Sequence, residues 1–296
     1  MIEIKNLTLG FSAIGRMYDD INKVFPDTPL VFRDLSLTIE PGHVYGLIGR
    51  NGAGKTTLMN CMCGLLGTRK VRKTISIDRH EVNVDNPTIT VKLFHVPDSI
   101  PSLHVTAHAY ASTLNKLYPN FSIDCYYDCM EQFQMNQDKF FDEMSLGQKK
   151  MTFLSLAFAA DTPYIILDEP TNGLDISARR VFRKLVASKM TDQKAIIIST
   201  HHINEISNLL DHILILDKNR IVFDHSVTET GSRLSFVESD NDADLDNAIY
   251  SMSSAYGKRI ILPNATGNDS EIDYELLYEA ILEDYQSIEN VFANNN

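Results

Sequence analysis

The sequence predicts an α/β protein with a mostly parallel sheet at its centre. Two continuous apolar runs, 164–167 and 195–198, have the length and composition of strands that are buried on both faces. Residues 176–190 lie between these runs and carry apolar residues at helical spacing. Two such strands joined by a helix indicate a parallel sheet, because parallel neighbours need a long crossover connection.

The N-terminal part predicts further strands. A third apolar run, 44–48, ends in a glycine-rich turn, and we expect a helix from Lys55 to Leu66 after it, closed by Gly67. Residues 2–11 and 30–40 have strand spacing and predict an antiparallel pair, so the sheet core is expected to be mixed. The segment 12–29 between this pair is longer than a hairpin needs, and the sequence gives no role for it.

The middle of the chain predicts a helical subdomain. Residues 101–160 carry apolar residues at helical spacing, interrupted at Pro119, and the run 145–160 is apolar enough to be buried. We place this subdomain inside a first domain that spans residues 1–229.

The C-terminal part predicts a small α/β appendage over residues 230–296. After 221–223 the composition shifts to Ser, Asp and Asn, and order returns in the apolar run 259–262 and the amphipathic stretch 274–288. Residues 225–296 contain 14 acidic and 3 basic side chains, so they carry nearly all of the net charge of −12. We expect the amphipathic stretch to pack on its own first domain, and the alternative is a regulatory or dimerisation module.

Composition limits the class of protein. The first domain is close to neutral, which gives no general electrostatic reason to bind nucleic acid. The longest apolar runs have strand length, and the first residues lack a basic segment followed by an apolar one, so we predict a cytoplasmic protein without its own membrane span. The four cysteines are expected to be thiols without a metal.

The segment Gly49–Thr56 matches the pattern G-x-x-x-x-G-K-[ST] and lies between a predicted strand and a predicted helix. In this context the pattern predicts a phosphate-binding loop, because backbone amides and the start of the helix attract phosphate oxygens. Lys55 is expected to reach the β and γ phosphates, and Thr56 to bind Mg²⁺. The predicted ATP contacts in this loop are Gly49, Asn51, Gly52, Ala53, Gly54, Lys55, Thr56 and Thr57.

Two carboxylates follow the apolar run 164–167. Asp168 and Glu169 are expected at the carboxyl end of a strand, on the edge of the sheet where the phosphate loop opens. We predict that Asp168 holds Mg²⁺ and that Glu169 orients or deprotonates the attacking water. An Asp-Glu pair alone would be interpreted as a solvated turn, and the phosphate loop upstream favours catalysis.

At this point the sequence resembles the ATP-binding cassette family. Residues 144–148 (Met-Ser-Leu-Gly-Gln) resemble the family's signature motif, residues 172–175 its D-loop, and 199–201 the segment with its switch histidine. The resemblance covers about residues 1–225 and depends on five motifs in register. It implies a P-loop ATPase fold in which two cassettes pack head to tail, each ATP lying between one phosphate loop and the other subunit's signature.

The resemblance also assigns roles to residues. It implies that Ser145, Gly147 and Gln148 face the γ-phosphate bound by a second subunit, and that His201 senses this phosphate in its own site, with His202 as a rival. Phe11 falls where the family has an aromatic side chain that stacks on adenine; core packing of Phe11, or Tyr18 in this role, are the alternatives.

Two positions depart from the family pattern. Asp98 occupies the place of the family's Q-loop glutamine, and a role as a Mg²⁺ ligand is the hypothesis for it. Leu146 replaces a signature glycine but leaves Ser145 and Gly147 in place.

The sequence therefore predicts the ATPase subunit of a transporter, with ATP and Mg²⁺ as cofactors. The expected partners are a second nucleotide-binding subunit, identical or not, and a transmembrane permease subunit that holds the chain at the inner face of the cell membrane. Export is the predicted direction, although no residue demands it. The alternative is a soluble regulatory ATPase of the same superfamily, acting on a complex outside the membrane.

Overall fold

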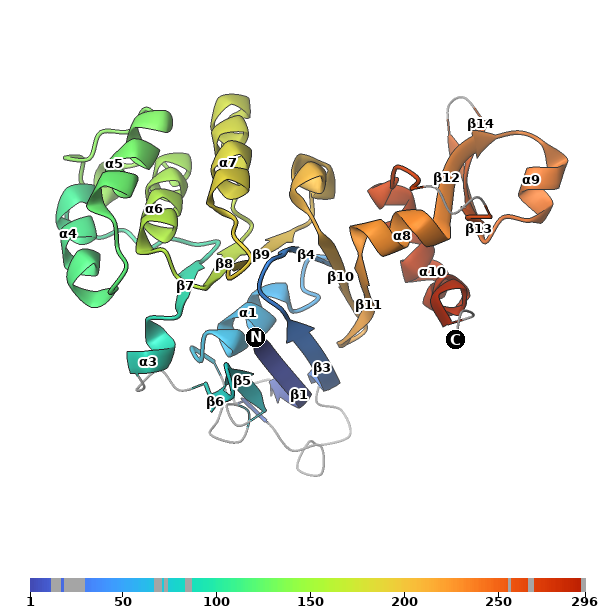
Figure 1. Cartoon of the computed structure of the whole chain (residues 1–296), viewed down its shortest axis with the longest axis horizontal. Coiled ribbons are helices and arrows are strands. Elements are labelled where there is room, and N and C mark those ends of the chain that lie inside the picture. The colour runs from blue at the N-terminus through green and yellow to red at the C-terminus, as the bar shows by residue number, and fades with distance from the viewer. Residues whose placement is uncertain are drawn as a thin grey trace.

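The computed structural model describes residues 1–11, 17–18, 30–66, 71, 74–82, 87–254, 257–265 and 269–293, with only the backbone of residues 11, 17 and 18. Its central sheet has six strands in the order β11-β10-β4-β9-β8-β7 (Figure 1). All neighbours are parallel except β10 and β11, which form an antiparallel edge pair. The predicted α/β class with a mostly parallel sheet is confirmed. The strands are β4 (Val44–Ile48), β7 (Leu93–Val96), β8 (Tyr164–Asp168), β9 (Ala195–Thr200), β10 (His212–Asp217) and β11 (Arg220–Ser226).

A second, antiparallel sheet lies at the N-terminal side. Its strands are β1 (Ile2–Phe11), β2 (Met17–Tyr18), β3 (Leu30–Ile39), β5 (Ile75–Ile77) and β6 (His80–Glu81), and β1 pairs with β3 as predicted. Helix α1 (Lys55–Met62) shares one apolar cluster with this sheet. The helix ends four residues before the predicted end, because the chain leaves the helical conformation at Gly64, which has φ +69°. Gly67 lies outside the described residues.

The helical part, at the left of Figure 1, projects from the edge strand β7. It contains α4 (Ala107–Leu117), α5 (Ile123–Gln132), the 3₁₀ turn η2 (Phe141–Glu143) and α6 (Leu146–Ala160), after the short α3 (Pro87–Thr90). Helix α6 packs against α4, α5 and α7 (Ile176–Lys189) and is buried along residues 152–160. Its burial explains why the run 145–160 is so apolar.

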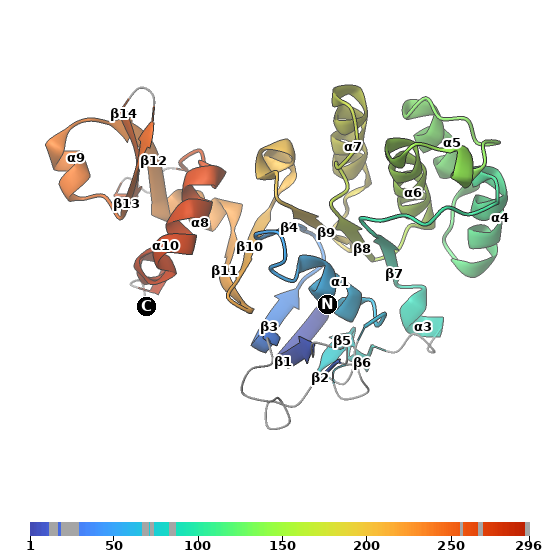
Figure 2. The same cartoon turned by 180° about the vertical axis from the view of Figure 1, so that it is seen from behind.

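The C-terminal elements form a third sheet, β12-β14-β13, and a long helix (Figure 2). In chain order they are α8 (Val227–Arg233), β12 (Leu234–Ser239), α9 (Asp242–Asp246), β13 (Tyr250–Ser254), β14 (Gly257–Pro263) and α10 (Tyr274–Ala293). The 3₁₀ turns η3 (Ile203–Glu205) and η4 (Ser207–Leu209) lie earlier, between β9 and β10 of the central sheet. Helix α10 buries Leu276, Leu277 and Ile281 in the same apolar cluster as Phe223 of β11. His225 of β11 contacts α10 through Glu289. This helix therefore packs on the part of the chain that precedes it.

Over the described residues, no helix combines the length and the apolar composition that crossing a bilayer requires.

Candidate active site

The phosphate loop, residues 49–56, connects the buried strand β4 to α1. Gly54 is the N-cap of α1 with φ +108°, and a Cβ there would lie 3.1 Å from the Phe32 ring, so the turn requires glycine. The Lys55 side chain is buried, and its Nζ donates to Gly49 O at 2.7 Å. Burial lowers the pKa of Lys55, and the charges of Glu169 and Asp168 oppose this shift. The loop thus holds an ammonium group under its own backbone.

Asp168 is fully buried at the end of β8 and accepts hydrogen bonds from two hydroxyl groups. Thr56 Oγ1 donates to Asp168 Oδ2 at 2.6 Å, and Ser199 Oγ donates to Asp168 Oδ1. Ser199 lies opposite Asp168 in the register of β9 on β8. Because hydroxyl and carboxylate oxygens are hard ligands, the pair Thr56 and Asp168 suits Mg²⁺ beside a phosphate loop.

Glu169 follows directly and has φ +45°, an unusual backbone conformation for a residue with a side chain. Its amide donates to Ser199 Oγ at 3.0 Å. Its Oε1 lies 2.9 Å from His201 Nδ1 and 3.8 Å from Lys55 Nζ. The positive φ therefore directs the carboxylate back over the phosphate loop. The His202 ring lies beside the His201 ring, with centroids 3.9 Å apart and the ring planes tilted by 44°, and it is His201 that contacts Glu169.

The signature segment, residues 144–148, starts helix α6. Ser145 is its N-cap and forms a capping box with Gln148, in which each side chain bonds the other residue's backbone amide. A Cβ on Gly147 would lie 2.5 Å from Gly173 O, so the signature packs directly on the 172–175 loop. Across the described residues, no hydrogen bond joins residues 145–148 to the phosphate loop.

Three residues have predicted roles that stay predictions: Asp98, Phe11 and Tyr18. Asp98 lies after β7, and its Oδ1 contacts Lys150 Nζ at 3.3 Å; among the described residues, no hydrogen bond or ion pair joins Asp98 to Thr56 or Asp168. The side chains of Phe11 and Tyr18 lie outside the described residues, so the adenine-stacking hypothesis stays a prediction.

The structure adds residues that the sequence interpretation missed. Ser199 and the fully buried Lys150 both contact the Asp168–Glu169 turn. A lysine inside the apolar run 145–160 was a signal for Lys150, whereas nothing in the sequence pointed to Ser199. Burial lowers the pKa of Lys150, and Asp98 opposes this shift.

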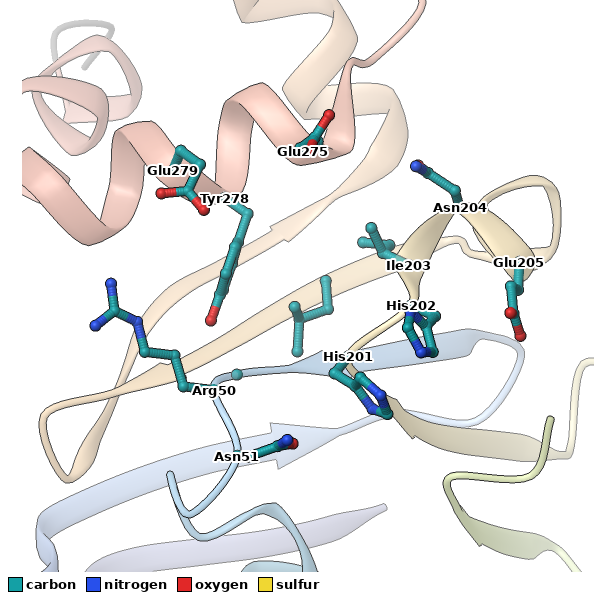
Figure 3. Close-up of a pocket in the computed structure, with 12 residues that line it drawn as sticks. Arg50, Asn51, His201, His202, Ile203, Asn204, Glu205, Glu275, Tyr278 and Glu279 are labelled. Carbon is teal, nitrogen blue, oxygen red and sulfur yellow. The ribbon is translucent and has the colours of Figure 1, made fainter. Parts of the chain in front are cut away.

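A cavity of 610 Å³ adjoins the phosphate loop and brings a C-terminal element to it (Figure 3). Arg50 and Asn51 form one wall, the segment 201–205 forms another, and α10 contributes Glu275, Tyr278 and Glu279. The Tyr278 hydroxyl points from α10 toward Arg50 (Figure 3). No sequence pattern indicated that α10 borders this site.

Comparisons with known proteins fit this geometry. The sequence profile of a family described as "ABC transporter" matches residues 32–172, from β3 to the loop after Glu169. The chain is 31% identical over 193 residues to the ABC transporter ATP-binding protein YtrB of Bacillus subtilis. Over its nucleotide-binding segments the chain is thus similar to ABC transporter ATP-binding proteins. The YtrB match covers 64% of this chain and 65% of YtrB, so the chain spans just under two thirds of that relative.

Other relatives and solved structures are similar to the chain over longer stretches. The ABC transporter ATP-binding protein NatA of Bacillus subtilis is 27% identical over 242 residues, which are 78% of this chain and 92% of NatA. Among solved structures, the ATP-binding cassette MJ0796, described as a dimer in a post-hydrolysis state with ADP and Pi, superposes with a TM-score of 0.62 at 20% identity. That match covers 76% of this chain and 98% of MJ0796, and it supports the ABC ATPase fold.

Proposed function

We propose that this chain binds ATP with Mg²⁺ and hydrolyses it in a head-to-tail dimer to drive transport through a separate transmembrane subunit. The observation that carries the proposal is the hydrogen-bonded set at the end of β8. Thr56, the adjacent Asp168 and Glu169, and His201 come from three segments of the chain and meet beside the phosphate loop. A solvated Asp-Glu turn would not need a buried Asp168 or contacts to both Thr56 and His201.

The proposed roles follow from these contacts. The backbone amides of residues 49–56 and Lys55 hold the phosphates, and Thr56 and Asp168 hold Mg²⁺, which neutralises phosphate charge. The Glu169 carboxylate accepts a proton from, or orients, the attacking water. His201 Nδ1 bonds Glu169 Oε1. A change in the bound phosphate that moves His201 would therefore also change the position of the Glu169 carboxylate.

The signature segment, residues 144–148, is the reason for proposing a dimer. Ser145 and Gln148 are exposed or half-buried, and in the single chain they bond each other. The helix N-terminus they form can attract an anion, and among the described residues no hydrogen bond joins it to the chain's own phosphate loop. A second nucleotide-binding subunit would supply the nucleotide for this site.

The remaining predictions stay proposals. We propose a nucleotide-binding domain over residues 1–229 and a smaller one over 230–296, and a position at the inner face of the membrane through the permease subunit. Relatives are named for export and for import, so the direction of transport stays a prediction.

The experiment that tests the proposal is co-purification. Tagged Glu169→Gln protein would be isolated from gently solubilised native cells with ATP and Mg²⁺ present, and its companions identified by mass spectrometry. This substitution is expected to hold the ATP-bound form, because it removes the base and keeps the binding groups. We expect a multi-span membrane protein in stoichiometric amount.

A Glu169→Gln/Lys55→Ala variant, which lacks the phosphate-binding ammonium, is the control for nucleotide dependence. If only soluble complexes accompany Glu169→Gln, the transporter proposal is wrong and the regulatory ATPase replaces it.

A further inference from the structure

Lys150 is a fully buried ammonium group in the second turn of helix α6, two residues after the signature segment. Removing a charge from water is costly unless the charge gains partners that replace its hydration. A lysine at a completely buried position therefore indicates that its contacts matter to the structure around it.

Those contacts join three segments of the chain. Lys150 Nζ donates to Asp168 O at 2.9 Å and to Glu169 O at 3.0 Å, which are the two carbonyls of the carboxylate turn. It also donates to Pro97 O at 3.2 Å and to Asp98 Oδ1 at 3.3 Å, in the loop after β7. Because an ammonium has three N–H donors, these four acceptors share them, and the shortest contacts are to the turn.

The turn needs such a partner on its carbonyl side. Glu169 has φ +45°, so its carbonyl and that of Asp168 leave the usual strand direction. On the other side, the Glu169 amide donates to Ser199 Oγ. The backbone at Glu169 is thus held from both sides, by Ser199 and by Lys150, and its carboxylate points to His201.

We propose that Lys150 is a positioning residue, which fixes the Glu169 carboxylate for hydrolysis and connects it to the signature helix and to Asp98. Asp98 is then the counter-ion of Lys150 and not a Mg²⁺ ligand. The inference rests on the proposed function, in which Glu169 is the hydrolytic carboxylate.

Through Lys150, the start of helix α6 is connected to the Glu169 turn. Ser145 caps the same helix from which Lys150 projects, five residues further on. A second subunit's nucleotide at Ser145 would shift or tighten the start of α6, and Lys150 would transmit this change to the Glu169 turn. Occupancy of the signature would in this way affect hydrolysis in the subunit that carries it.

The test compares Lys150→Met with Lys149→Met. Methionine fills the volume of the buried side chain without its charge, and Lys149 is the matched control, since its Nζ donates to Ser102 and not to the turn. We expect Lys150→Met to lower kcat for ATP about 10–100-fold through misplacement of the base. KM and the affinity for a fluorescent ATP analogue should change less than about twofold, and Lys149→Met should match wild type.

A mutant cycle separates positioning from a general structural role. In the Glu169→Gln background, Lys150→Met should reduce the residual rate no further, because the group it positions is gone. A further loss in that background, or equal rates for Lys150→Met and Lys149→Met, would overturn the inference.

Asp98 gives a second variant that keeps the ammonium. Asp98→Asn preserves an acceptor for Lys150 Nζ but removes the counter-charge, and Asp98→Ala removes both, so we expect a loss of kcat of about two- to tenfold for Asp98→Ala and a smaller loss for Asp98→Asn. Asp98→Ala added to Lys150→Met should cost nothing more. If Glu169→Gln itself leaves hydrolysis intact, the proposed function fails; if Glu169→Gln abolishes hydrolysis and Lys150→Met does not slow it, only the role of Lys150 fails.

Discussion

The phosphate-loop side of the candidate site and the signature side differ in what their polar groups contact. On the first side, Thr56 bonds Asp168 and His201 bonds Glu169, across separate strands and loops. On the second side, the partners of the Ser145 and Gln148 side chains among the described residues are their own helix and Lys139, and Leu146 between them is 51% exposed. One side is assembled within the chain, whereas the other presents a helix start outward.

This difference in contacts indicates that the two sides have different functions. Groups that move protons and hold a metal need fixed mutual geometry, and contacts inside one chain supply it. A helix N-terminus whose amides are capped by its own residues can exchange these partners for a phosphate when a second subunit arrives. We therefore expect substitutions on the phosphate-loop side to reduce ATP hydrolysis severely. We expect the loss caused by a substitution on the signature side to be restored when a second subunit supplies an intact signature.

The largest expected effect comes from Glu169→Gln. Glutamine keeps the size of the side chain and a contact for His201 but accepts no proton, so ATP turnover should fall about 10²–10⁴-fold. Binding of ATP should be largely retained, because Lys55 and Thr56 are untouched. Steady-state hydrolysis and equilibrium binding measure the two effects; unchanged turnover would remove Glu169 from the mechanism.

The second prediction tests both sides together, in a mixture of two variants that are each inactive alone. Glu169→Gln disables the phosphate-loop side, and Gly147→Asp disables the signature side, since any Cβ at Gly147 meets Gly173 O. In a mixed head-to-tail dimer, one composite site contains both intact sides. An equal mixture should therefore recover about a quarter of wild-type hydrolysis, because about half of the dimers are mixed and each has one working site of two.

Each variant mixed with wild type serves as the reference for subunit exchange. If the mixed variants stay inactive while exchange is demonstrated, for example by co-purification of differently tagged subunits, each chain must complete its own site and the head-to-tail dimer is wrong.

The sequence was most informative where chemistry depends on contiguous residues. The phosphate loop, the Asp168–Glu169 pair and the signature segment are short patterns, and strands β4, β8 and β9 follow from apolar runs that are buried on both faces. The end of α1 was predicted too late, since the helical spacing continues past Met62 while Gly64 turns the backbone. Local patterns predict where an element begins better than where it ends.

The missed residues have a common physical reason. Ser199 acts through a cross-strand register, Lys150 through a helix that crosses the end of β8, and Tyr278 through the docking of α10 beside Arg50. These contacts join residues 18 to more than 200 positions apart in the chain. Such pairs depend on tertiary packing, which spacing in one sequence does not encode.

The smallest expected effect concerns Leu146, the position where the signature side departs from the pattern of the family that it resembles. Leu146→Gly restores the family's glycine, and Leu146→Ala is the control that shortens the side chain without adding backbone freedom. Glycine in a helix should lower the free energy of unfolding by about 0.5–1 kcal/mol relative to alanine, as measured in urea. Because the Leu146 side chain is half exposed and, among the described residues, has no bond to the Asp168–Glu169 turn, hydrolysis should stay within about twofold of wild type.

If both variants instead weaken ATP-dependent dimerisation tenfold or more, as measured by sedimentation in the Glu169→Gln background, then the leucine is itself a contact to the second subunit. The signature side would then bind its partner through an apolar side chain as well as through the helix start.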